Sequence, residues 1–163
     1  YEVISVRFLH GKIPEESMQH LEDILKRMKN LTVPAECGQL DTVQAFVDGE
    51  LDRVPSCTME ARIQLQVAVE ELFVNIASYA YAPGSGAAVI GCQVEERPPS
   101  ITIQFRDRGK PFDPLAKKDA DITLSAEDRQ IGGLGIYMVK NSMDHVSYAR
   151  ENGENVLTIQ KNL

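Results

Sequence analysis

Three short segments of the chain hold the residues whose types and spacing suit chemistry. Glu71 and Asn75 stand four residues apart in a stretch with helical character, so their side chains share one helix face. Burying a carboxylate and an amide on an otherwise apolar helix is costly unless each has a partner. A hydroxyl or water proton suits Glu71, and a magnesium ion suits Asn75. A solvated polar stripe accounts for the pair equally well, because Glu70 lies next to it.

The second segment begins with Asp107, which ends an expected strand and precedes Gly109 by two residues. A carboxylate at this position can accept a hydrogen bond from an exocyclic amine such as adenine N6. A glycine beside it lets the backbone come close to a flat ring. Taken alone, Asp-x-Gly is more often a common turn.

The third segment, Gly132-Gly133-Leu134-Gly135, leads directly into an expected helix. Glycines there allow unusual backbone angles and point amides at an anion, with help from the helix N-terminus. It is not a dinucleotide fingerprint, because no third glycine follows at the right spacing and a loop, not a strand, is expected before it. Nor is Gly109-Lys110-Pro111 a P-loop, because no Ser or Thr follows Lys110. Alone, the segment fits a hinge as well. The order, spacing and element type of all three segments together favour an ATP site without a P-loop.

The elements that must position these segments follow from hydrophobic periodicity and turn residues. The longest is a helix that Thr58 caps and that reaches about Tyr81; it is apolar almost all round, which predicts a central, buried helix. A weakly patterned loop is expected from Gly109 to about Gly133. The other expected elements are strands at 1–10, 31–34, 87–96, 100–107 and on both sides of 152–154, and helices at 14–30, 40–54 and 134–144. This order predicts a two-layer α+β fold.

Composition narrows the class of protein. The 163 residues, 43% hydrophobic and 25% charged, predict one soluble globular domain. A net charge of −7 argues against nucleic acid or an anionic membrane as the main partner. Three widely spaced cysteines indicate a reduced, cytoplasmic protein, and no apolar run has the length of a membrane span. Because the chain starts at Tyr1 without Met, we expect a fragment.

Four phrases, at 69–77, 106–114, 133–139 and 153–159, resemble the GHKL ATPase superfamily, and within it the anti-sigma factor serine/threonine kinases. The resemblance covers roughly residues 31–163. Residues 1–30 are expected to be a strand–helix extension or the remnant of an upstream domain or linker. The resemblance implies the Bergerat ATP-binding fold, a two-layer α+β sandwich in which helices cover one face of a mixed, mostly antiparallel sheet.

The resemblance also implies a site for ATP and Mg²⁺. Glu71 would be the general base toward a serine or threonine hydroxyl, Asn75 would ligate the magnesium ion, and Asp107 would hold the adenine amine. The residues that would contact the nucleotide are Asn75, Asp107, Gly109, Phe112, Gly133, Leu134 and Gly135. Residues 113–132 would form a lid, in which Lys117, Lys118 or Arg129 would reach the γ-phosphate.

The function so implied is an ATP-dependent protein kinase that phosphorylates an antagonist protein and controls a sigma factor, as a cytoplasmic homodimer. The chain departs from the pattern at Tyr79, where such kinases commonly carry His. Three alternatives stay open. In the first, the chain is a histidine kinase domain with His20 as phosphoacceptor. In the second, it is a non-catalytic module in which ATP only orders the lid, and in the third it is the C-terminal part of a larger regulator such as a phosphatase fusion.

Overall fold

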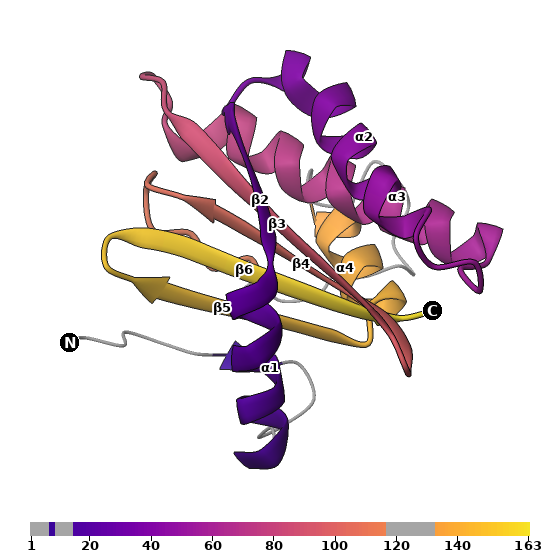
Figure 1. Ribbon diagram of the computed structural model, residues 1–163. Helices are drawn as coiled ribbons and strands as arrows, with labels where there is room; N and C mark the ends of the chain where they lie inside the picture. Colours follow the sequence, from indigo (N-terminus) through magenta and orange to yellow (C-terminus); the bar gives the residue numbers. More distant parts are fainter. Residues whose placement is uncertain (1–6, 9–14, 117–132) are drawn as a thin grey trace.

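The computed structural model describes residues 7–8, 15–116 and 133–163, and it has one antiparallel sheet as its centre (Figure 1). The strand order is β1-β5-β6-β4-β3-β2, and each described pairing is antiparallel. The strands are β1 (Arg7–Phe8), β2 (Lys29–Pro34), β3 (Ala87–Glu96), β4 (Pro99–Asp107), β5 (His145–Glu151) and β6 (Glu154–Asn162). The helices are α1 (Glu15–Arg27), the 3-10 turn η1 (Cys37–Gln39), α2 (Leu40–Leu51), α3 (Met59–Asn75), the π-helical turn η2 (Ile76–Ala80) and α4 (Gly133–Ser142). The predicted α+β fold is confirmed.

The core lies between one face of the sheet and the helices α2, α3 and α4. Ile90 and Cys92 on β3 lie opposite Phe105 and Ile103 on β4, and all four are almost fully buried. Leu65, Ala68, Val69, Leu72 and Phe73 on α3 complete this layer from the helical side. Because side chains alternate along a strand, every second side chain of these strands points toward α3. Helix α3 also carries Glu71 and Asn75.

Helix α3 begins where the sequence predicts, because the Thr58 hydroxyl accepts a hydrogen bond from the Ala61 amide at 3.1 Å. The prediction of a central, buried helix holds for one side of α3 only. Ile63 is 51% exposed and Val67 is 40% exposed. A helix packed on one face of a single sheet has only one side against the core, so its opposite side stays at the surface even when it is apolar.

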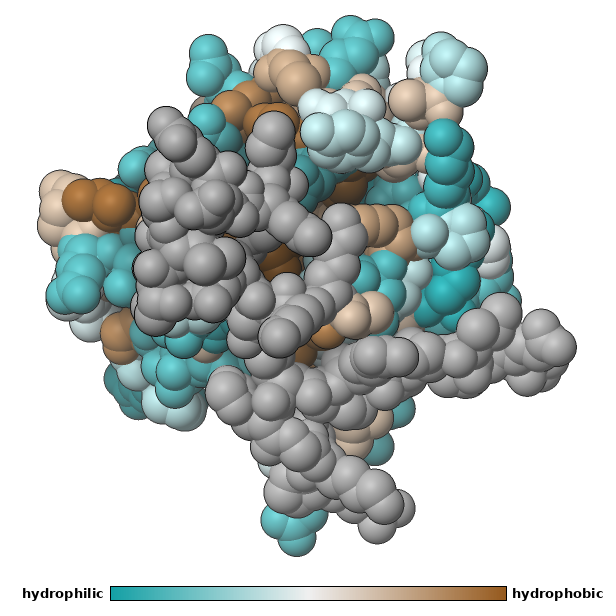
Figure 2. All heavy atoms as spheres, turned by 180° about the vertical axis from the view of Figure 1, so that it is seen from behind, coloured by the Kyte–Doolittle hydropathy of each residue, from teal (hydrophilic) through white to brown (hydrophobic). Residues whose placement is uncertain are grey.

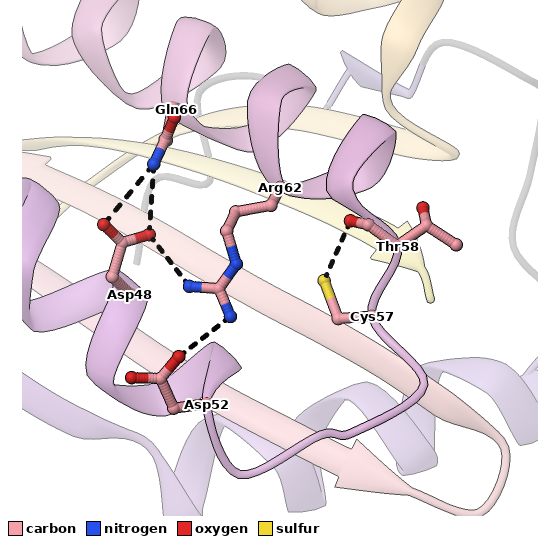
Figure 3. Close-up of polar contacts among 6 residues, drawn as sticks. All are labelled: Asp48, Asp52, Cys57, Thr58, Arg62 and Gln66. Atoms are coloured by element: carbon pink, nitrogen blue, oxygen red, sulfur yellow. Dashed lines mark hydrogen bonds and ion pairs between the residues drawn. The ribbon is translucent and has the colours of Figure 1, made fainter.

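Polar side chains fix the rotation of α3 against α2 (Figure 3). Asp48 on α2 accepts hydrogen bonds from Arg62 at 3.4 Å and from Gln66 at 3.5 Å. Arg62 also pairs with Asp52 at 2.9 Å, and Gln44 donates to the Gln66 carbonyl at 2.8 Å. Individually such partly exposed contacts are weak. Together they hold α3 against α2, whereas the buried apolar side chains of α3 form the face that meets the sheet.

Helix α1 lies on the other side of the sheet from α4 (Figure 1). Met28, just after α1, lies so close to Gly91 of β3 that a Cβ atom at Gly91 would overlap the methionine sulfur. Ile24 on α1 is completely buried. The helix predicted to reach Asn30 ends at Arg27, because Lys29 already pairs with Cys92 as the first residue of β2.

Some predictions fall on residues outside the described ranges. They are the strand at positions 1–6 and 9–10 and the lid residues Lys117, Lys118 and Arg129. Within the described residues, no helix combines the length and the apolar character needed to cross a membrane.

Ile24→Ala tests whether α1 is part of the folded domain. Because Ile24 is 0% exposed, its truncation should lower the free energy of unfolding by about 2–4 kcal/mol in urea denaturation. Met18→Ala on the same helix, 38% exposed, should change it by less than about 1 kcal/mol. Equal, small effects of the two substitutions would contradict the packing of α1 on the sheet.

Candidate functional site

At one end of the sheet, three neighbouring strands bring polar residues into a row on the face that meets α3. Asp107 of β4 lies opposite Asn155 of β6, and Asn155 lies opposite Arg150 of β5. Asp107 and Asn155 are each only 6% exposed. Such burial is tolerable only where hydrogen bonds replace water, so the contacts of these two residues define the site.

Asn155 uses all four of its hydrogen-bonding positions. Its Nδ2 donates to Asp107 Oδ1 at 3.0 Å and to the Lys110 carbonyl at 2.8 Å. Its Oδ1 accepts from the Phe112 amide at 3.2 Å and from the Tyr148 hydroxyl at 2.6 Å. The loop after β4 is therefore tied to β6 by one buried side chain. Burial raises the pKa of Tyr148, which keeps its hydroxyl protonated as a donor at neutral pH.

The same loop is also tied to β5 and to the end of the α3 segment. Arg150 donates to the Gly109 carbonyl at 2.9 Å, and the Lys110 amide donates to the Ala80 carbonyl at 2.9 Å. A Cβ atom at Gly109 would overlap the backbone of Ala80. The expected reason for this glycine was room for an adenine ring. The structure supplies another reason, since the η2 backbone occupies the space that a side chain would need.

Glu71 and Asn75 lie on the site side of α3, both half-buried, and Asn75 Nδ2 donates to Glu71 Oε1 across 3.4 Å. The neighbouring Glu70 is exposed, so the two glutamates face different surroundings. A Cβ atom at Gly135 would overlap the Glu71 carboxylate. The carboxylate therefore packs directly against the first turn of α4, where helical N–H groups carry partial positive charge.

The remaining predicted site residues surround this pair. Gly133 is the first residue of α4, Leu134 follows it with 39% exposure, and Phe112 after the β4 loop is 44% exposed. Tyr79 lies in η2 and is 70% exposed. Regular α-helical geometry ends at Asn75, and a π-helical turn at such a point is a frequent feature of functional sites.

On the face seen from the opposite side to Figure 1, hydrophobic and hydrophilic atoms lie next to each other (Figure 2). The polar groups of the site come from three sources: the sheet end with Asp107, the α3 face with Glu71 and Asn75, and the N-terminus of α4. The structure thus brings the three sequence segments around one region. This arrangement suits a ligand with a flat donor group at one end and an anionic group at the other.

Sequence reasoning did not identify Asn155, Tyr148 or Arg150 as site residues. A signal was present, because Asn155 occupies an inward position in the alternation that continues with buried Leu157 and Ile159. A polar residue in the apolar phase of a strand needs a buried partner. That partner, Asp107, is far away along the chain, so only the strand pairing reveals it.

The sequence of this chain is similar to those of known proteins. Residues 33–161 match the family model described as a histidine kinase-like ATPase domain, and the chain belongs to this family. The serine/threonine-protein kinase BtrW of Bordetella bronchiseptica is 31% identical over 60% of this chain and 68% of its own length. The serine-protein kinase RsbW of Staphylococcus aureus is 25% identical over 83% of this chain and 85% of its own length. The resemblance to the GHKL ATPases, and among them to protein serine kinases, is confirmed.

Gly135→Ala and Gly49→Ala form a matched pair of helix substitutions. In α2, Gly49 has open space around it, so alanine should raise the free energy of unfolding by about 0.5–1 kcal/mol. In α4, alanine at Gly135 must displace the Glu71 carboxylate, the flexible end of a half-buried side chain, so it should stabilise less than alanine at Gly49 does. Urea denaturation measures both. Equal stabilisation by the two substitutions would contradict the close approach of α4 to Glu71.

Proposed function

We propose that this chain is an ATP-dependent protein serine/threonine kinase of the anti-sigma type. The observation that carries the proposal is the position of Glu71. Its carboxylate is half-buried, lies beside Asn75 and packs against the first turn of α4. This arrangement would place the base for a substrate hydroxyl, a magnesium ligand and a helix N-terminus for the phosphates together, as phosphoryl transfer to a protein side chain requires.

The described residues fit the nucleotide and its metal ion. Asp107 Oδ1 is occupied by the Gly109 amide and Asn155, whereas Oδ2 has no hydrogen bond with the described part of the chain. Asp107 would hold the adenine amine, and the turn with Gly133, Leu134 and Gly135 would hold the phosphates. Magnesium usually binds to one or two protein groups plus substrate phosphates. Asn75 would be the protein ligand; among the described residues, no group of three His, Cys, Asp or Glu side chains could hold a metal ion.

Each residue would have one task in transfer. Glu71 would accept the proton of the attacking serine or threonine hydroxyl. Asn75 would orient the metal-bridged phosphates, and its amide also keeps Glu71 in place. The N–H groups at the start of α4 would stabilise charge on the phosphate oxygens. Magnesium, when bound, supplies neutralisation of the triphosphate charge. Rate enhancement would come from positioning and charge stabilisation.

Two alternatives have less support. As phosphoacceptor of a histidine kinase, His20 would have to reach the site, yet it lies exposed on α1, on the other side of the sheet from α4. In a purely nucleotide-binding regulator, no reason exists for a carboxylate to be held at the start of α4. The names of the similar proteins, both protein serine kinases, also favour the kinase.

The biological setting belongs to the same proposal. An antagonist protein would be the phosphorylated substrate, and a sigma factor would be the partner that is sequestered, with the kinase acting as a cytoplasmic homodimer. Residues 31–163 would form the kinase domain, and residues 1–30 would be an extension or part of an upstream region. Tyr79, exposed on η2, would contact a partner or the phosphates in place of the usual histidine.

Glu71→Ala separates a kinase from a binding module. Transfer of labelled phosphate from magnesium-ATP to candidate antagonist proteins should fall by at least about 100-fold, because the general base is lost. ATP affinity in calorimetry should stay within a few fold. Glu70→Ala, an exposed carboxylate one residue away, is the matched control and should retain transfer. If Glu71→Ala transfers phosphate at the normal rate, Glu71 is not the base.

Asn75→Ala tests the magnesium ligand. Wild-type protein should bind ATP more tightly when magnesium is added, and this increase should disappear in Asn75→Ala because the ion loses its protein ligand. Calorimetry with and without magnesium measures the effect. Gln64→Ala, a half-buried amide earlier on α3, should keep the increase. Survival of the magnesium dependence in Asn75→Ala would make Asn75 a structural residue.

A further inference from the structure

The hydrogen bonds of Asn155 fix the orientation of its own amide. The Phe112 N–H can only donate, so the group facing it must be the carbonyl Oδ1. The Lys110 carbonyl can only accept, so the group facing it must be Nδ2. These two backbone contacts leave one Nδ2 hydrogen, and it points to Asp107 Oδ1 at 3.0 Å. Asn155 therefore presents a donor to Asp107 that cannot turn into an acceptor.

Asp107 Oδ1 is saturated as a result. It accepts from Asn155 Nδ2 and from the Gly109 amide at 2.9 Å, so two donors take up its two lone pairs. The other oxygen, Oδ2, accepts no hydrogen bond from the described residues. It is not among the buried side-chain atoms that lack a partner, so it remains accessible to a ligand. Oδ2 is therefore the acceptor that Asp107 can offer to a ligand hydrogen.

We infer that Asn155 is a specificity-determining residue: it holds Asp107 so that an acceptor faces the ligand, and the site selects a purine with a 6-amino group over one with a 6-oxo group. The inference rests on the proposed ATP site and deepens it. A 6-amino group donates to Oδ2. A 6-oxo group places an oxygen against a carboxylate oxygen, which leaves both unpaired and repelling each other. Asn155 acts through Asp107, so it is a positioning residue.

Because two donors hold Oδ1 of Asp107, the substitution Asp107→Asn has an unusual expected outcome. The Gly109 amide and Asn155 both donate, so the new amide must keep its oxygen at the Oδ1 position. Its NH₂ group then takes the place of Oδ2 and faces the ligand as a donor. Such a site favours a 6-oxo purine. An Asn that was free to rotate would instead present either group and lose discrimination.

The experiment measures the affinities of ATP and ITP, which differ in the 6-substituent, for the full chain by calorimetry. Wild-type protein should prefer ATP by about tenfold or more. Asp107→Asn should bring the ratio to unity or invert it in favour of ITP. Asn155→Leu should reduce the wild-type ratio at least about threefold, because Asp107 loses its fixed orientation. Gln104→Leu removes a side-chain hydrogen bond between the same two strands, to Thr158, and should leave the ratio unchanged.

The ratio distinguishes specificity from mere stability. If Asn155→Leu weakens ATP and ITP equally, Asn155 is only structural and the inference is overturned. If Asn155→Leu does not fold, Asp107→Asn decides alone, and a tenfold preference for ATP in that variant overturns the inference. Wild-type protein that binds ATP and ITP equally overturns the inference but not the ATP site. Wild-type protein that binds neither nucleotide overturns the proposed function as well.

Discussion

The structure depends on the hydrogen bonds that fix two polar residues, Asp107 and Asn155, which are buried at one end of the sheet. A buried amide with unpaired hydrogen-bonding positions would be costly. Pairing all positions of Asn155 requires the loop after β4 to turn back, so that its Lys110 carbonyl and Phe112 amide meet Asn155. The shape of the loop is thus a consequence of the pair.

Two close backbone approaches then join this sheet end to the helices. The loop reaches η2 at Ala80, where the Ala80 backbone leaves no room for a side chain at position 109, and α4 reaches α3 at Glu71, whose carboxylate would have to move for a side chain at position 135. Side-chain contacts between α2 and α3 hold α3 against α2 (Figure 3). The sheet end, the α3 face and the α4 terminus therefore hold each other in place, although they are far apart along the chain.

Much of this arrangement was predictable from local sequence. The strand pair around residues 97–99, the Thr58 cap and the final hairpin followed from periodicity and turn residues, and all are present. The exposed side of α3 was not predictable, because an apolar residue such as Ile63 looks the same whether or not another element covers it. Nor was Asn155, since its meaning depends on strand pairing with Asp107. Gly109 and Gly135 were predicted to be needed at their positions, but the groups that lie next to each glycine follow only from the tertiary structure.

The two carboxylates at the centre of the site have opposite environments, and the difference matches the tasks proposed for them. Asp107 is buried in the sheet, with one oxygen fixed by two donors, which suits recognition of a rigid ring. Glu71 is half-buried, and among the described residues it has one long hydrogen bond, from Asn75, and packs against the first turn of α4. A proton acceptor needs this freedom, because it must approach a substrate hydroxyl that arrives with another protein. In the proposed kinase, rigid recognition would therefore come from the sheet, and adaptable chemistry would come from the contact between two helices.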